Sequence, residues 1–422
     1  MRLRQACGLD FIACSKPGFA RRHALLTVDY GSADALWRPR PGDEPQPAPH
    51  GVAHFLEHRL FDKGDGDISA RFTALGADVD AHTSFTSTAY SFTCSDRFEE
   101  SLALLLELVL EPHFTEAAVD RERDIITREI ELYDDSVDWV AFNALMRSLY
   151  GDGAMGDDIA GTPQSLERID VTVLEACYRD YYRPPRMSLV VAGDLDADAA
   201  AAMVDEALAA RSCDGEAALP RPAAVAQPRR ETRRLTVSTP RLLVAGAASG
   251  HQVEGLDLLR LELSLDLGLD ILFGPSSAFY DRHYRSGLVD DETFGCDVYC
   301  EPTYTFCTVG GDTPEPARLE DEIAGQVEAG LQGGLIDQGF ERSRRRSWGN
   351  LVCRYEEVDA CAAIAQSAAA RRAGVFDYFE AYEGLQAGDV IAALSLCLAS
   401  RPWGVATVLP RREDGHPQGE DE

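Results

Sequence analysis

Lysine is scarce in this sequence of 422 residues: only Lys16 and Lys63 are present, and arginine supplies nearly all of the positive charge. Acidic residues outnumber basic ones, so the formal net charge is −31 at pH 7. Binding to nucleic acid or to an anionic membrane requires clustered lysine and arginine. The charge therefore argues against both partners and favours a neutral or basic peptide as the ligand.

Long apolar segments are also absent, since no stretch of about 18 uncharged apolar residues occurs in the sequence. Residues 1–17 contain charged side chains and lack the apolar region of a secretory signal. The 11 cysteines form no Cys-x-x-Cys pair, which is typical of reduced thiols in a reducing compartment. We do not expect the closest group, Cys296, Cys300 and Cys307, to bind metal. These observations predict a cytoplasmic protein that does not span a membrane.

One short string carries a clear chemical pattern, His54-Phe55-Leu56-Glu57-His58. On a helix, His54 and His58 project from the same face because they are four residues apart, and Glu57 lies beside them. This H-x-x-E-H order is the inverted form of the commoner zinc peptidase string H-E-x-x-H. The string therefore predicts two zinc ligands and a general base on a single helical turn.

A catalytic zinc ion usually takes three protein ligands, so a further side chain is needed from elsewhere in the chain. The best candidates are Glu122 and Glu129, which are seven residues apart in a segment with helical apolar spacing. This spacing places both carboxylates on one helix face. One of them could bind the metal and the other could support the site, although a charged helix over 116–134 taken alone is more often a solvated face.

The string Gly51–His58, followed by the segment Glu122–Glu129, resembles the insulinase/pitrilysin family of zinc metallopeptidases. The resemblance implies three zinc ligands, which are His54, His58 and Glu129. It also implies that Glu57 is the general base and that Glu122 supports the ligands, whereas Glu131 would face the wrong way. We therefore expect one zinc ion per chain, although cobalt or manganese also accepts such ligands.

The activity implied by the resemblance is hydrolysis of peptide bonds. Zinc lowers the pKa of a bound water molecule and polarises the carbonyl group under attack. Glu57 would accept the proton of the water and pass it to the leaving amine. Glu122 would orient the ligating groups. No serine or cysteine nucleophile is required.

The predicted fold class is α+β, with two similar α/β-sandwich domains joined by a linker, as in mitochondrial processing peptidase and insulinase. Residues 1–213 form the zinc-binding domain, residues 214–234 a proline- and arginine-rich linker, and residues 235–410 a second domain without metal ligands, before a disordered tail over 411–422. Strands are predicted over 24–30, 87–94, 188–192, 242–247, 293–309 and 404–409. Helices are predicted at the H-x-x-E-H string, from 197, and over 99–110, 116–133, 256–273, 315–331 and 337–357.

The resemblance further implies that an unfolded peptide pairs with an edge strand of the zinc-binding domain. The matching segment begins with the predicted substrate-binding residues Asp80, Ala81, His82 and Thr83. Asp80 stands where the family often has asparagine.

The closest resemblance is to short bacterial members with one pair of domains, which build a complete chamber by dimerising. In many members an arginine and a tyrosine of the second domain hold the substrate carbonyl group, but here Tyr284 and Asp290 occupy these positions. The sequence therefore predicts the catalytic subunit of a heterodimeric processing endopeptidase, whose paralogous partner lacks zinc ligands and supplies the arginine and tyrosine. Its substrates would be unfolded peptides or leader segments, including ribosomally made peptides. The alternatives are a homodimeric oligopeptidase that uses Arg282 or Arg285, and a non-catalytic scaffold subunit.

Overall fold

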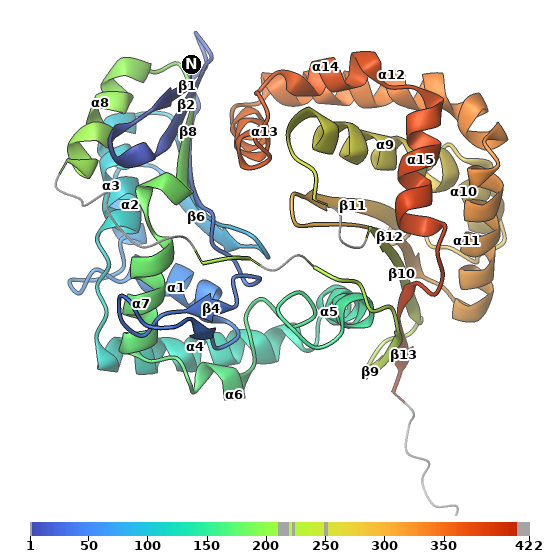
Figure 1. Cartoon of the computed structure of the whole chain (residues 1–422), viewed down its shortest axis with the longest axis horizontal. Helices are drawn as coiled ribbons and strands as arrows, with labels where there is room; N and C mark the ends of the chain where they lie inside the picture. The colour runs from blue at the N-terminus through green and yellow to red at the C-terminus, as the bar shows by residue number, and fades with distance from the viewer. Residues whose placement is uncertain (1, 210–218, 222–223, 249–251, 412–422) are drawn as a thin grey trace, which may run out of the picture.

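The computed structural model describes residues 2–209, 219–221, 224–248 and 252–411, which form two β-sheets with helices packed against them (Figure 1). The first sheet has the strand order β1-β2-β8-β3-β7-β6, and β4 and β5 form a separate small ribbon. The strands are β1 (Arg2–Arg4), β2 (Asp10–Ser15), β3 (Arg22–Val28), β4 (Leu36–Trp37), β5 (Gln46–Pro47), β6 (Asp78–Thr83), β7 (Thr88–Cys94) and β8 (Met187–Gly193). Strand β6 is an edge strand and pairs with β7.

The first half of the chain also contains α-helices, most of which lie on one face of this sheet (Figure 1). They are α1 (Val52–Phe61), α2 (Ser69–Ala74), α3 (Phe98–Leu110), α4 (Glu116–Tyr133), α5 (Val137–Tyr150), α6 (Pro163–Leu166), α7 (Val171–Tyr181) and α8 (Ala197–Leu208), with short 3-10 turns η1 (Ala6–Gly8) and η2 (Pro184–Arg186). Leu56 of α1 and Leu105 of α3 pack in one core with Leu26 and Phe92 of the sheet. Burial of this apolar surface holds α1 in place under the sheet.

The second sheet has the strand order β11-β12-β10-β13-β9. Its strands are β9 (Arg230–Leu235), β10 (Arg241–Ala248), β11 (Gly295–Glu301), β12 (Tyr304–Asp312) and β13 (Gly404–Pro410). The helices are α9 (Gly255–Phe273), α10 (Ala278–Arg285), α11 (Pro316–Leu331), α12 (Gly334–Glu356), α13 (Val358–Ala370), α14 (Asp377–Gly384) and α15 (Ala387–Leu398). The α+β class with two similar halves is therefore confirmed.

Each half places one helix against the sheet of the other half. Helix α5 lies against β13, β10 and β9, and α13 lies against β8 and β3 (Figure 1). Ala362 and Ala365 of α13 pack on Val190, and Ser188 Oγ donates to Gln366 Oε1 at 2.6 Å. The two halves are thus joined by packed helices as well as by the connecting chain.

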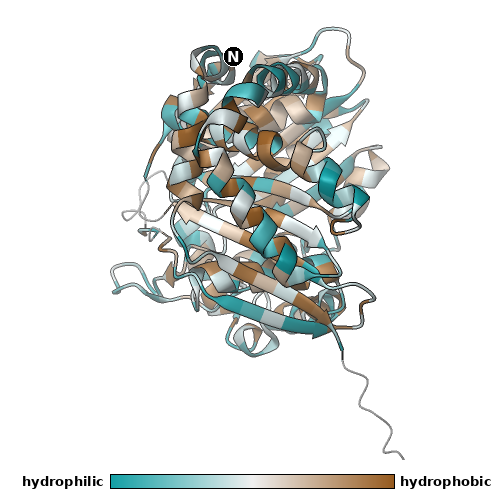
Figure 2. Ribbon diagram, turned by 90° about the vertical axis from the view of Figure 1, so that its right-hand side faces the viewer, coloured by the Kyte–Doolittle hydropathy of each residue, from teal (hydrophilic) through white to brown (hydrophobic). Residues whose placement is uncertain are grey.

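The linker prediction is wrong at its end, because residues 230–234 belong to β9. Their side chains alternate between exposed and partly buried, as expected for an edge strand with one covered face. Figure 2 shows this hydrophilic strand beside the more hydrophobic β13, with which it pairs in parallel. The predicted boundary at 213/214 and residues 412–422 of the predicted tail lie outside the described residues.

Most of the predicted elements are present within a few residues of their expected bounds. The elements that were not predicted include β1, β2, β4, β5, α2, α10, α13, α14 and α15. No helix in the described ranges is long and apolar enough to cross a membrane. Among the described residues nine cysteines are free, but Cys7 is disulfide-bonded, so the prediction of reduced thiols is wrong at that position.

Candidate metal centre and active site

Helix α1 places both histidines of the H-x-x-E-H string on the side that faces α4. The helix begins after Gly51, whose φ of 90° lies in the left-handed region that favours glycine. A Cβ atom at Gly51 would lie 2.5 Å from the carbonyl oxygen of Ala160. The buried apolar residues of the helix are Val52, Ala53, Phe55, Leu56 and Leu60. The start and the packing of α1 therefore determine the direction of its polar side.

Helix α4 brings the two predicted glutamates to α1. The side chain of Thr115 caps the helix by accepting the backbone N–H of Ala118 at 3.3 Å. Ile126 and Ile130 are buried beneath it. Glu122 and Glu129 are partly buried and face α1, whereas Glu131 is exposed.

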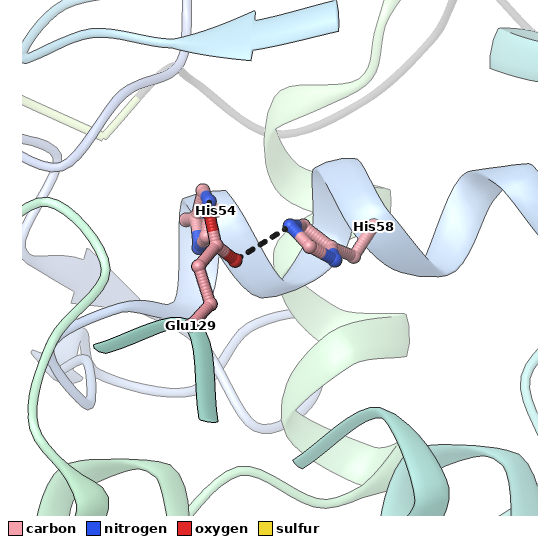
Figure 3. A group of neighbouring side chains, drawn as sticks. All are labelled: His54, His58 and Glu129. Atoms are coloured by element: carbon pink, nitrogen blue, oxygen red, sulfur yellow. Dashed lines mark ion pairs between the residues drawn. The ribbon is translucent and has the colours of Figure 1, made fainter. Parts of the chain in front are cut away.

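His54, His58 and Glu129 point toward one another across the two helices (Figure 3). Oε2 of Glu129 lies 3.4 Å from Nε2 of His58, and Oε1 lies 4.0 Å from Nε2 of His54. Each of the three residues offers one ligand atom, and these three atoms all lie within 4.8 Å of one another. Ligand atoms around a tetrahedral zinc ion are separated by about 3.4 Å. The spacing therefore fits a metal ion after small movements of the side chains.

The protonation of His54 also fits metal binding. Burial, followed by the charge of His58, lowers the pKa of His54 to about 3. Its Nδ1 atom is buried and has no hydrogen-bond partner within the described chain. A neutral imidazole with free ring nitrogen atoms is the form that binds a metal ion. His54 is thus prepared to act as a ligand.

Glu122 fixes the orientation of the second histidine. Nδ1 of His58 donates to Oε1 of Glu122 at 3.1 Å, which leaves Nε2 directed to Glu129. Burial opposes charge on His58, but the hydrogen bond to Glu122 and the nearby carboxylates raise its pKa. Burial acts against the charge of Glu122 as well, yet the hydrogen bonds from His58 and Arg59 lower its pKa. This is the arrangement by which outer carboxylates orient metal-binding histidines.

Arg59 is the residue of this site that sequence reasoning missed. Its side chain is almost completely buried, at 1% exposure. The guanidinium group donates to Oε2 of Glu122 at 3.2 Å, to Oδ2 of Asp62 at 3.1 Å and to the carbonyl oxygen of His113 at 3.3 Å. The available signal was a charged residue between buried leucines of α1. Arg59 thus connects α1 to α4 behind the metal ligands.

Glu57 lies on the same helical turn and is 7% exposed. Its Oε2 atom accepts a hydrogen bond of 2.5 Å from Oγ1 of Thr83, and Oε1 has no hydrogen-bond partner in the described part of the chain. Burial raises the pKa of Glu57, while the bond from Thr83 acts in the opposite direction. A carboxylate with one fixed and one free oxygen can accept a proton from a nearby group.

The predicted substrate-binding segment forms edge strand β6. The side chains of Asp80 and His82 are exposed, and those of Ala81 and Thr83 are partly buried toward α1. Because β6 pairs with β7 on one side, its other side presents backbone groups at the edge of the sheet.

The residues at the predicted arginine and tyrosine positions lie far along the chain, in and after α10. Tyr284 is about half exposed on α10, and Asp290 accepts backbone N–H groups of the following turn at 3.1 Å. Arg282 and Arg285 are exposed, and each lies beside a carboxylate, at 3.7 Å and 2.8 Å respectively. Within the described structure none of the four contacts the histidine–glutamate group.

Comparisons with known proteins show the family to which this chain belongs. A family model described as insulinase (peptidase family M16) matches residues 44–163, and one described as the peptidase M16 inactive domain matches residues 168–347. The uncharacterised zinc protease YmfH of Bacillus subtilis is 33% identical over 410 residues, which are 96% of this chain and 95% of the relative.

Solved structures show the same architecture. An M16-like peptidase from Alicyclobacillus acidocaldarius has a TM-score of 0.90 and 30% identity, with 97% of this chain and 98% of that chain covered. A protease from Helicobacter pylori, at 16% identity, shares the fold with a TM-score of 0.81 over 97% of this chain and 99% of that chain. The two halves are thus two M16-type domains, and the chain belongs to the insulinase family of peptidases, family M16.

Proposed function

We propose that this protein is a zinc-dependent endopeptidase. The observation that carries the proposal is the convergence of His54, His58 and Glu129 on one point, with Glu57 on the same turn of α1. Relatives named zinc proteases, such as YmfH, support the choice of metal and of reaction. In this proposal the three converging residues are the zinc ligands, one ion is bound per chain, and Glu57 and Glu122 are the catalytic and supporting carboxylates.

The proposed mechanism assigns a separate task to each carboxylate. Zinc, when bound, supplies an acidified water molecule and polarises the substrate carbonyl group. Oε1 of Glu57 accepts the proton of the water and passes it to the leaving amine, since this oxygen has no other partner within the described residues. Glu122 keeps Nδ1 of His58 protonated, so that Nε2 remains available for the metal.

The proposed substrate is an unfolded peptide that adds a strand to β6. The backbone of Asp80, Ala81, His82 and Thr83 would form the new ladder, which explains why no side-chain pocket is needed for affinity. Exposed Asp80 would favour basic or neutral residues in the substrate, in agreement with the net charge of −31.

We further propose that the chain is the catalytic subunit of a heterodimeric processing peptidase of the cytoplasm, acting on peptides or leader segments. Tyr284 and Asp290 cannot supply the cationic group expected opposite the metal, so a paralogous subunit without zinc ligands would provide an arginine and a tyrosine. The exposure of Arg282 and Arg285 supports a second candidate, a homodimer in which these side chains act across the interface. A non-catalytic scaffold is the third.

The experiment compares the full chain purified alone with the chain co-expressed with its nearest paralogue. We would measure zinc content and cleavage of an unstructured peptide library in both samples. Cleavage only in the mixed sample supports the heterodimer, and cleavage by the chain alone, lost in an Arg282→Ala/Arg285→Ala variant, supports the homodimer. Full zinc occupancy without cleavage in either sample would favour the scaffold, and absence of zinc would contradict the ligand assignment.

A further inference from the structure

Thr83 is the last residue of edge strand β6, and its side chain faces α1. Along this strand the side chains of Asp78, Asp80 and His82 are exposed, whereas those of the alternate residues, Thr83 included, are partly buried. Because successive side chains of a strand point to opposite faces, Thr83 does not share the face of Asp80 and His82. Its hydroxyl group is therefore directed into the site and not toward the solvent-exposed face of the strand.

The neighbouring groups determine which atom accepts the hydroxyl proton of Thr83. Oγ1 of Thr83 lies 2.5 Å from Oε2 of Glu57 and 3.4 Å from Oγ1 of Thr88. Thr88 is completely buried and donates its own proton to the carbonyl oxygen of Tyr30 at 2.9 Å. A threonine hydroxyl group has only one proton to donate. The proton of Thr83 therefore goes to Glu57, across the shorter contact.

We infer that Thr83 is a positioning residue that holds the carboxylate of Glu57 so that Oε1 faces a peptide docked on β6. The inference rests on the proposed peptidase function, and it changes the predicted role of Thr83 from contact with the substrate to control of the base. A carboxylate held by one hydrogen bond keeps one orientation, and correct orientation of a catalytic group contributes strongly to rate.

The position of Thr83 in the fold couples two parts of the site. Its backbone belongs to the edge that would pair with the substrate, and it lies opposite Thr88 in the β6–β7 ladder. Its side chain contacts the base on α1, 26 residues away in the sequence. One residue thus fixes the distance between the docked peptide backbone and the group that accepts the proton.

The test compares Thr83→Val, which keeps the shape but removes the proton, with Thr83→Ser, which keeps the hydroxyl group. The zinc-loaded full chain, with its partner subunit if one is required, is assayed on an unstructured peptide that the wild type cleaves. We expect Thr83→Val to lower kcat roughly ten- to hundredfold, because the variant loses a hydrogen bond to a charged group. KM, zinc stoichiometry and the midpoint of thermal unfolding should stay close to wild-type values, and Thr83→Ser should restore most of kcat.

Peptide binding provides a readout that does not depend on turnover. In a Glu57→Gln background, adding Thr83→Val should leave the Kd of the same peptide unchanged. A higher Kd, or a higher KM with unchanged kcat, would show that Thr83 contacts the substrate and would overturn the inference. An equal loss of kcat in the Val and Ser variants, or loss of zinc in both, would show a purely structural role. Absence of cleavage by the zinc-loaded wild type would overturn the proposed function, and the inference with it.

Discussion

Nδ1 of His58 lies 3.1 Å from Oε1 of Glu122, so a carboxylate on α4 sets the tautomer of a histidine on α1. The same carboxylate binds the buried guanidinium group of Arg59 through its other oxygen at 3.2 Å. Glu122 thus connects α4 to both His58 and Arg59 of α1. The contact between His58 and Glu122 orients the imidazole ring so that Nε2 faces Glu129. His58 and Glu129 can therefore approach the same metal ion together with His54.

Replacement of Glu122 by glutamine should weaken zinc binding while leaving the three ligands in place. The loss of an outer-shell carboxylate lowers metal affinity by roughly ten- to hundredfold. Zinc affinity is measured by competition with a chromophoric chelator. Glu131→Gln is the matched control, since Glu131 is exposed on the same helix. Equal zinc affinities for the two variants would contradict the assigned role of Glu122.

Replacement of Arg59 by methionine should lower the free energy of unfolding by about 3 kcal/mol, because it leaves buried carboxylates without their cation. Arg121→Met is the control: its side chain is mostly exposed and lies 3.7 Å from Asp62. Removing such a surface pair should cost less than about 1 kcal/mol. Urea unfolding followed by circular dichroism gives both values. A neutral effect at Arg59 would show that the network does not stabilise the fold.

The grouping of the candidate side chains within each helix could be predicted from the sequence because their spacing within that helix is local. His54, Glu57 and His58 share one turn, and the seven-residue spacing of Glu122 and Glu129 places them on one helix face. The spacing alone allows either Glu122 or Glu129 to be the third metal ligand. The proposed choice of Glu129 rests on the family resemblance.

Contacts between distant segments could not be predicted. Arg59 has one local partner, Asp62, three residues away, but its other partners, His113 and Glu122, lie 54 and 63 residues away and no local pattern joins them to it. The same limit applies to α5 and α13, whose apolar faces could pack on either sheet. Strand β9 was assigned to the linker because its four charged residues resemble a solvated segment, although an edge strand exposes every second side chain.

Replacement of Gly51 by alanine should destabilise the protein more than the same change at Gly18. The φ values are similar, 90° and 82°, so the left-handed backbone should lower the free energy of unfolding of both variants by about 1–2 kcal/mol. Only at Gly51 would the new Cβ atom meet a backbone oxygen, at 2.5 Å, whereas Gly18 has open space. The midpoint of thermal unfolding measures the difference. Equal midpoints would contradict the close approach of α1 to Ala160.

The stability of the protein should depend on pH through His23. Burial lowers the pKa of His23, Arg21 also lowers it, and Asp359 acts in the opposite direction. Because the pKa in the folded state lies below that in the unfolded chain, the unfolded chain binds more protons as the pH falls. The contribution of neutral His23 is therefore present above about pH 6.5 and is lost below it.

A His23→Gln variant removes this dependence while keeping a polar side chain near Thr93. Between pH 7 and pH 5 the zinc-loaded wild type should lose more unfolding free energy than the zinc-loaded variant. Thermal unfolding at both values of pH gives the comparison. An equal loss in the two proteins would show that His23 does not titrate as its burial requires.

The most direct measurement is the rate of cleavage of an unstructured peptide by wild-type protein and by Glu57→Gln, each with one zinc ion per chain and with the partner subunit present if cleavage requires it. We expect the wild type to cleave and Glu57→Gln to be inactive while it retains zinc, because the variant lacks the group that accepts the proton. Cleavage at the same rate by both proteins would contradict the assignment of Glu57 as the base and of this site as the centre of catalysis.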